Sequence, residues 1–497
     1  MNIKLKLKNR LGFRKTSVFL LMLLGTVTMV SAQTVSGTVS ADGQPLPGAS
    51  IVVKGTTIGT STDFDGNFTI EADAKSTLSI SYIGYVTKEV LVGNQTQINI
   101  TLEEGNKLDE VVVIGYGTQK KSDLTGSVST VSAEDITAVP VSRVDQALQG
   151  RAAGVQVTQT SGAPGAGTSI RVRGGNSITG SNEPLWVIDG IVVGSNFNLN
   201  NINSSDIKSI EILKDASSIA IYGSRGANGV ILVTTKNGLG IGGGKPQVNI
   251  GTYTSMQLVP ERPKYLSQAQ QIDYTNEDAR FRGVAEPFPG NPSDYPDNDF
   301  FDLLLNASPI HNVDVSIAGS SENGSVNYYN SLNYFNQDGL IDNSGIKKYI
   351  FRSNIDFKLS EKLKAGFRIN YSRLNQDNGV VGYGGLLNIL PTQPIFNADG
   401  SYSGFNDVIG APFNNPVATA LLDLDNTKTN NLLGTVYLEY SPIKNLIIRS
   451  TFNPEINNWK RNEFTSSQRP DLTVVGETGN ARITGVSSFG WNNENTI

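Results

Sequence analysis

The chain has 497 residues, no cysteine, a single histidine (His311) and a formal net charge of −5. The absence of cysteine excludes disulfides and Cys/His zinc sites, and one histidine leaves Ser-His-Asp catalysis a single candidate base. The acidic balance disfavours nucleic acid as a partner. We expect no enzymatic activity and no cofactor or metal. The 52 glycines are typical of a chain with many short strands and turns.

Residues 1–32 have the pattern of a secretory signal peptide. An apolar stretch over residues 17–30 is followed by the small residues Ser31 and Ala32, which predicts cleavage before Gln33. A membrane anchor is the alternative, but this stretch is shorter than the ~20 residues that a spanning helix needs. The expected mature charge is −5 − 6 = −11, because the segment carries six basic residues: Lys4, Lys6, Lys8, Arg10, Arg14 and Lys15.

Residues 33–103 predict a small β-sandwich. Short β-branched segments such as "GASIVVKG" and "STLSISYIG" are separated by turn residues. Asp63 and Asp65 in "DFDG" could indicate calcium, but the other ligands of a calcium loop are missing. A tight turn between two strands is therefore expected there.

Residues 104–119 predict a linker that contains a β-branched run, Val111 to Ile114. The run has no obvious sheet of its own. It is either an ordinary strand of a neighbouring domain or an extended, unpaired strand on which a partner can pair its main chain.

Residues 120–237 predict a mixed α/β domain. Its expected strands lie in "SVSTVS", "SIRVRG", "PLWVIDG", "SIEILKD" and "NGVILVTTK", with helices over residues 142–151 and 216–222. The glycines of "GSRGANG" (223–229) precede a strand instead of following one. A nucleotide-binding loop is therefore not expected, and tight turns are.

Residues 245–497 predict about eight amphipathic strands. In "KAGFRINYSR", apolar residues alternate with polar ones, and residues 349–359 behave likewise. We expect short connections at about 320–324, 360–361 and 441–445. Longer ones are expected at about 258–310, 337–346, 375–430 and 454–479. Strict alternation of short and long connections is typical of a transmembrane barrel, whereas a soluble sandwich or a secreted adhesin gives no reason for it.

Several long, ordered stretches resemble known families. "SGTVSADGQPLPGASIVVKGTTIGTSTDFDGNF" resembles the carboxypeptidase-regulatory-like domain, which implies an Ig-like or prealbumin-like fold without peptidase activity. "LDEVVVIGYGTQKKSDLTGSVSTV", "IRVRGGNS", "PLWVIDG" and "SIEILKDASSIAIYGSRGANGVILVTTK" resemble the SusC/RagA-type TonB-dependent receptors of Bacteroidetes. The combined fold expectation is mainly β: a β-sandwich, an α/β plug and the first strands of an antiparallel transmembrane β-barrel.

The resemblance also implies which residues carry the function. The TonB box, where the partner TonB would pair, corresponds to Asp109, Glu110, Val111, Val112, Val113, Ile114, Gly115 and Tyr116. The plug signature corresponds to Arg171, Arg173, Gly174, Gly175, Asp189, Gly190, Tyr222, Gly223, Arg225, Gly226 and Gly229.

The implied activity is import across the outer membrane, driven by TonB with its ExbB–ExbD motor, of an oligosaccharide or peptide too large for porins. A SusD-like lipoprotein lid is the implied partner. No substrate residue is assigned: Tyr383, Phe396, Tyr402 and Phe405 either stack on sugar rings or pack within their loops. A plug of this size requires about 22 strands, so a truncated chain or a fragment is expected.

Overall fold

A computed structural model describes residues 33–41, 43–56, 58–82, 85–103, 111–114, 117–120, 128–138, 142–194, 197–239, 245–261, 264–408, 410–474, 476 and 478–497. The predicted signal peptide lies outside these residues. The chain forms two compact units, residues 1–111 and 112–497, which are described separately.

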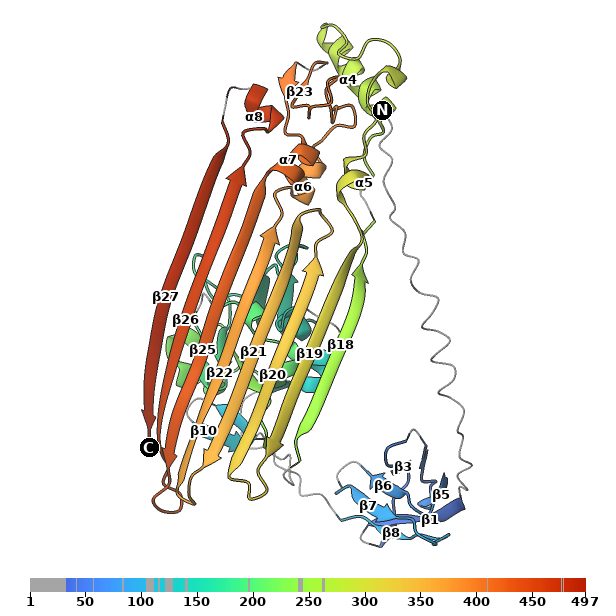
Figure 1. Cartoon of the computed structure of the whole chain (residues 1–497), viewed down its shortest axis with the longest axis vertical. Coiled ribbons are helices and arrows are strands. Elements are labelled where there is room, and N and C mark those ends of the chain that lie inside the picture. The colour runs from blue at the N-terminus through green and yellow to red at the C-terminus, as the bar shows by residue number, and fades with distance from the viewer. Residues whose placement is uncertain are drawn as a thin grey trace, which may run out of the picture. The chain divides into compact units, whose positions relative to one another are not determined.

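The first unit is a β-sandwich of two four-stranded sheets (Figure 1). Its strands alternate between buried and exposed positions, as in β5, because successive side chains of a strand point to opposite faces. The buried side chains of both sheets form one aliphatic core that includes Val39, Ile51 and Leu78. One sheet contains β1 (Gln33–Ala41), β2 (Gln44–Pro45), β5 (Asn67–Ala72) and β8 (Ile100–Thr101); the other contains β3 (Ser50–Val53), β4 (Gly59–Ser61), β6 (Thr77–Ser81) and β7 (Lys88–Leu91).

The turn expected at Asp63 joins β4 to β5. The Asp63 carboxylate accepts hydrogen bonds from the backbone N–H groups of Asp65 (3.0 Å) and Asn67 (2.8 Å). These bonds lower the pKa of Asp63, and the bond from the backbone of Asn67 has the largest effect. The carboxylate therefore stabilises its own turn.

In the second unit, the predicted strands of the α/β domain are present. A five-stranded sheet has the order β11-β16-β17-β14-β15, and β12 and β13 form a separate hairpin. The elements are β11 (Val128–Ser132), α2 (Ala133–Thr137), η2 (Gln146–Leu148), β12 (Val155–Gln159), β13 (Thr168–Val172), β14 (Leu185–Ile188), β15 (Ile191–Val192), η3 (Leu199–Asn201), η4 (Ser204–Asp206), β16 (Ile207–Leu213), α3 (Ala216–Ile219), η5 (Ala220–Gly226) and β17 (Val230–Thr235).

The helix predicted over residues 142–151 is wrong. Only the single 3₁₀ turn η2 forms there. The Asp145 carboxylate accepts hydrogen bonds from Arg143 Nε (3.0 Å), the Gln146 backbone (3.0 Å) and Thr168 Oγ1 (2.5 Å). The first two bonds are local and compete with a helical ladder, whereas the bond from Thr168 comes from 23 positions away. Gly150 adopts a left-handed φ of 73° that ends the turn.

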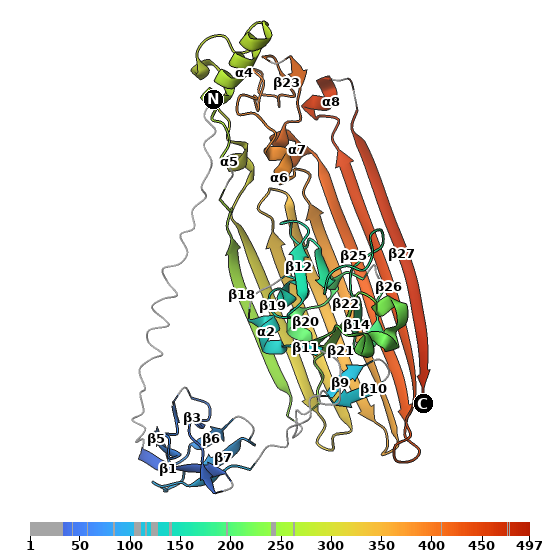
Figure 2. The ribbon, with the colours of Figure 1, turned by 180° about the vertical axis from the view of Figure 1, so that it is seen from behind.

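The second unit also contains an eight-stranded antiparallel sheet in which each strand pairs with the next strand of the sheet along the chain (Figures 1 and 2). Its strands have 11 to 18 residues, longer than the expected ten or so. They are β18 (Gln247–Gln257), β19 (Ser308–Ser320), β20 (Val326–Asp338), β21 (Ser344–Lys358), β22 (Leu363–Asn378), β25 (Leu424–Tyr440), β26 (Ile448–Thr465) and β27 (Asn480–Thr496).

The register of this sheet aligns side chains of one kind. An apolar row crosses all eight strands, and an adjacent, mainly polar row faces the opposite way, because side chains alternate along each strand. The apolar row is Ile250, Val315, Leu332, Phe351, Tyr371, Leu432, Ile456 and Phe489; the other is Gly251, Asp314, Asn333, Ile350, Ser372, Asn431, Asn457 and Ser488. The predicted two-faced sheet is confirmed.

The connections of this sheet follow the predicted alternation with one exception. Those at 321–325, 359–362 and 441–447 are short, and those at 258–307, 379–423 and 466–479 are longer. The connection at 339–343 is short although a longer one was predicted, because β20 and β21 continue their pairing from Val326↔Phe357 to Asp338↔Gly345.

The longer connections fold together at one end of the sheet (Figure 1). Phe300, Phe301, Leu304, Leu386 and Ala420 form a common apolar core there. The elements are α4 (Gln268–Arg282), η6 (Pro292–Asp294), α5 (Phe300–Leu304), α6 (Tyr383–Leu386), β23 (Phe405–Asn406), β24 (Ala411–Pro412), α7 (Pro416–Leu422) and α8 (Pro470–Val474). No helix among the described residues is long and apolar enough to cross a membrane.

Candidate coupling segment and domain–sheet interface

The predicted coupling segment contains a strand, β9 (Val111–Ile114). An unpaired strand was expected here, but β9 pairs with β10 (Gly117–Lys120) in a two-stranded sheet. Asp109, Glu110, Gly115 and Tyr116 lie outside the described residues. A two-stranded sheet leaves one edge of each strand without a neighbour in the described chain, and such an edge can pair with a further strand.

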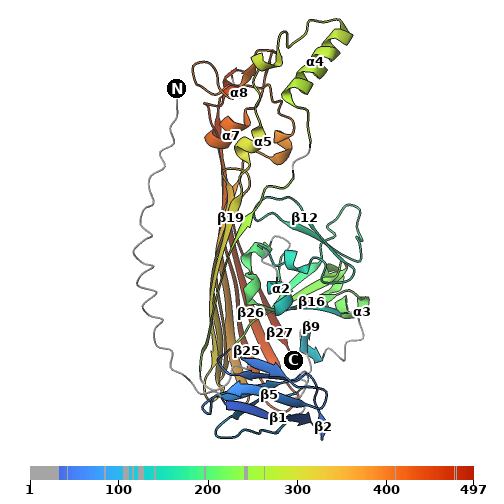
Figure 3. The same cartoon turned by 90° about the vertical axis from the view of Figure 1, so that its right-hand side faces the viewer.

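The α/β domain lies against one face of the eight-stranded sheet (Figure 3). An ion pair between Asp189 of the domain and Arg352 of β21 joins the two. Asp189 and Gly190 form the two-residue turn between β14 and β15, with φ values of 49° and 88°, as an Asp-Gly hairpin turn requires. The Asp189 carboxylate accepts hydrogen bonds from the Thr235 backbone (2.9 Å) and hydroxyl (2.7 Å). It also pairs with the Arg352 guanidinium of β21, and both side chains are nearly buried (11% and 3% exposed).

A second contact joins η4 of the domain to β19 and β20. The Tyr329 hydroxyl donates a 2.9 Å hydrogen bond to the Asp206 carboxylate, and the Ser205 hydroxyl donates one of 2.9 Å to Asp314. Asn203 also donates to Asp314. Burial raises the pKa of Asp206, although the nearby Arg352 charge opposes this shift.

Further polar contacts extend the interface across β21 and β22. Asn370 donates to the Asn201 backbone carbonyl, and Ser372 donates to the Asn201 side chain, both at 2.9 Å. Lys348 of β21 is buried and donates to the Ser142 carbonyl. These contacts between the domain and the sheet are thus hydrogen bonds, together with the ion pair between Asp189 and Arg352.

The first group of predicted signature residues lies at the end of the β13 strand. Arg171 pairs with Glu183 (2.6 Å), and Arg173, which has a left-handed φ of 57°, pairs with Asp215. Gly174 follows with a φ of 101°, and Gly175 packs beside Asn182. These residues connect the end of β13 to neighbouring loops of the same domain, and their ion pairs do not involve the eight-stranded sheet.

The second group surrounds the 223–229 turn. Tyr222 packs against the domain's smaller apolar cluster, and Arg225 is exposed. Gly223 breaks the helical geometry of η5 with a φ of 59°. A Cβ at Gly226 would lie 3.2 Å from the Ile219 carbonyl. One at Gly229 (φ 91°) would lie 3.0 Å from Val172. The glycines therefore permit close packing and turns, as predicted from their position before a strand.

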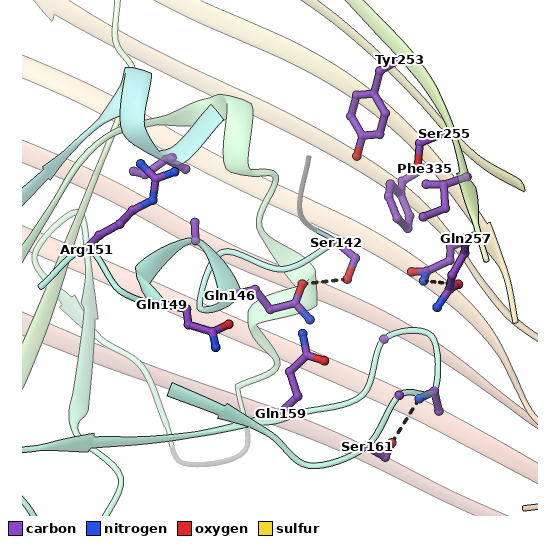
Figure 4. A pocket seen from close by; sticks show the side chains of 17 residues that line it. Ser142, Gln146, Gln149, Arg151, Gln159, Ser161, Tyr253, Ser255, Gln257 and Phe335 are labelled. Atoms are coloured by element: carbon purple, nitrogen blue, oxygen red, sulfur yellow. Dashed lines mark hydrogen bonds between the residues drawn. The ribbon is translucent and has the colours of Figure 1, made fainter. Parts of the chain in front are cut away.

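A cavity of about 450 Å³ lies between residues 142–165 of the domain and strands β18 to β20 (Figure 4). Gln146, Gln149 and Gln159 face it from the domain, and Tyr253 and Gln257 face it from the sheet. We call this cavity the amide pocket. Among the described residues, no group of three or more His, Cys, Asp or Glu side chains is arranged to hold a metal ion.

The loop aromatics make contacts within the loops. The Tyr383 ring packs edge-on against Phe301, with 5.3 Å between centroids, and Phe396 stacks on Tyr402 at 5.2 Å. This favours the packing alternative for these three residues.

Sequence reasoning missed the sheet partners of the interface. Arg352 was placed on the polar face of its strand, but its pairing with Asp189, 163 positions away, was not foreseen. Tyr329 and Lys348 were not singled out at all. The available signal was a charged residue at a sheet position that faces the domain, which indicates a buried partner because unpaired charges are rarely buried.

Comparison with known proteins agrees with this architecture. Residues 120–230 match the TonB-dependent Receptor Plug Domain, and residues 35–113 match the CarboxypepD_reg-like domain. The chain is 68% identical over 466 residues to TonB-dependent receptor P26 of Formosa agariphila, covering 94% of this chain and 47% of that protein. It is 34% identical over 460 residues to TonB-dependent receptor SusC of Bacteroides thetaiotaomicron, covering 85% and 44%.

Solved structures show the same fold. The RagAB peptide importer in its open-open state matches with a TM-score of 0.65 at 25% identity, over 78% of this chain and 46% of that chain. The RagAB peptide transporter matches with a TM-score of 0.64 at 23% identity, over 74% and 45%. The chain spans about half the length of the curated relatives it matches.

Proposed function

This chain belongs to the SusC/RagA-type TonB-dependent receptors. From this premise, we propose that it functions in the TonB-driven import, across the outer membrane, of a nutrient too large for porins. The observation that carries the proposal is the α/β domain, a plug by its family match, held against one face of a sheet of barrel strands through polar contacts. The opposite face of that sheet presents the apolar row, which would meet lipid.

The coupling step would use the candidate TonB box, from Asp109 to Tyr116, which contains β9 (Val111–Ile114). The C-terminal domain of TonB would pair with it as an added strand, and the ExbB–ExbD motor would apply the force. Each backbone hydrogen bond contributes only about 1 kcal/mol net, so several bonds loaded together would resist the pull. The pairing of β9 with β10 supports this role, because residues 111–114 of the segment are already in the extended form that strand addition needs.

The plug would then move away from the eight-stranded sheet. A polar interface suits this step, because water can replace its hydrogen bonds when the plug moves, whereas a continuous apolar core would be exposed at a large cost. The nutrient would be an oligosaccharide or a peptide, and a SusD-like lipoprotein would cover the folded loops. The RagAB importer is named for a peptide cargo, which supports the peptide alternative, and the oligosaccharide alternative is what the SusC-type resemblance implies.

Substitution at Val112 tests the coupling. Val112→Pro removes a backbone N–H that a pairing strand needs. It should abolish growth on the carbon source that induces the gene, and it should abolish formaldehyde cross-linking to TonB. The surface level of the receptor should stay unchanged. Val112→Ala keeps the N–H and is the matched control, because a partner that pairs with the main chain should still bind. Normal growth and cross-linking of the proline variant would refute the assignment.

A further inference from the structure

The amide pocket is lined by groups that can both donate and accept hydrogen bonds. Its described lining includes five glutamine amides and three serine hydroxyls. An amide supplies two donors and one acceptor oxygen, and a hydroxyl supplies both functions. The pocket is therefore suited to a ligand that itself offers donors and acceptors side by side, as vicinal hydroxyl groups do.

Much of this hydrogen-bonding capacity is unused. Gln337 is only 8% exposed, and its Oε1 atom is buried without a hydrogen-bond partner among the described residues, while its Nε2 donates to Gln257 at 3.3 Å. The side chains of Gln149 and Gln159 are exposed and form no hydrogen bond with the described part of the chain. A buried amide oxygen without a hydrogen-bond partner destabilises the folded protein. A ligand hydroxyl that donates a hydrogen bond to this oxygen would remove the penalty.

The sheet side of the pocket adds apolar surface. Tyr253 faces the pocket from β18 and Phe335 from β20 (Figure 4). Both belong to an apolar cluster with Ile346 and Leu374, which holds their rings in place. Rigid rings beside amides are suited to a ligand that has an apolar C–H face and a polar rim.

The charge of the lining narrows the ligand class. Arg151 is the one charged side chain among the described residues that line the pocket, and it pairs with Asp135 at 3.2 Å. Without a lining carboxylate, the ammonium or guanidinium group of a peptide would lose its hydration with no counter-ion. A sugar hydroxyl carries no such penalty, and Arg151 could meet a carboxylate or sulfate.

We propose that the amide pocket binds a saccharide unit, neutral or acidic. Its volume of about 450 Å³ is within the range of small-molecule sites, about 300–1,000 Å³. The inference deepens the proposed import and rests on it for one statement only, that the bound saccharide is cargo. Binding itself does not depend on TonB.

The test measures binding to the complete receptor purified in detergent, by native mass spectrometry. One probe set contains linear tetra- to hexasaccharides with neutral, uronate-bearing and sulfated members; the other contains tetra- to hexapeptides. We expect saccharide binding that Gln149→Leu/Gln159→Leu weakens about tenfold or more, because two amides are lost. Both positions are exposed, so the fold should persist. Gln156→Leu, exposed on the same β12 strand but outside the lining, should bind like the parent.

Three results would overturn the inference: no saccharide binds, peptides bind to the amide residues instead, or the double variant matches Gln156→Leu. The Val112→Pro receptor separates this inference from the proposed import. If the Val112→Pro receptor still binds saccharide, the inference about the amide pocket holds even when cells that carry this receptor do not grow.

Discussion

The Asp189–Arg352 ion pair should control how firmly the plug is held against the sheet. Both groups are nearly buried, and removing one partner from a buried pair costs about 3–5 kcal/mol because the other charge is left unpaired. Asp189→Asn keeps a side chain that tolerates the left-handed φ of 49° at this turn. If this substitution weakens plug docking by about 3 kcal/mol, the population of released plug should rise about 100-fold.

Thiol labelling can measure this release, because the chain has no native cysteine. An Ile350→Cys reporter is suitable, since Ile350 is 2% exposed on the sheet face that carries the domain contacts. Maleimide should label this cysteine about 100-fold faster in the Asp189→Asn background, and Asp189→Asn/Arg352→Met should recover part of the loss because no charge is left unpaired.

Arg368→Met is the matched control, because Arg368 pairs with Asp356 within the sheet (3.4 Å). It should leave the labelling rate close to that of the parent. A labelling rate for Asp189→Asn within about threefold of the parent would refute the reasoning, because it corresponds to less than 1 kcal/mol.

Three further predictions concern pH, packing and lipid. Burial raises the pKa of Asp206 above 3.8, so its contribution to docking is complete below that value and is lost as pH rises through the raised pKa. The urea midpoint of plug release should therefore increase as the pH is lowered from neutral toward 3.8, and Asp206→Asn should lose that dependence. Gly37→Ala should lower the melting temperature of the N-terminal sandwich by about 5 °C or more, because its Cβ would lie 1.8 Å from the Ile98 carbonyl; an unchanged melting temperature would contradict this packing. Leu332→Arg on the apolar row should cost about 2–4 kcal/mol and reduce folding into bilayers, whereas Glu322→Arg in the adjacent turn should not.

Local features were predictable because they depend on neighbours in sequence. Asp63 lies in a turn whose residue types favour it, and the alternation around Phe351 and Tyr371 places these residues on one face in any pairing. The helix predicted over residues 142–151 does not form partly for a non-local reason: Asp145 accepts a hydrogen bond from Thr168, which the hairpin β12–β13 brings close.

The sequence alone determined the strand segments, the two-faced character of the sheet and the family resemblance, because these follow from side-chain period and residue type over short spans. Only the tertiary structure decided which groups meet. The pairing of Asp189 with Arg352 and the facing of Gln159 and Tyr253 across the amide pocket depend on strand register and on how the domain packs. The first pair joins residues 163 positions apart (352 − 189) and the second 94 (253 − 159), and no local pattern encodes such contacts.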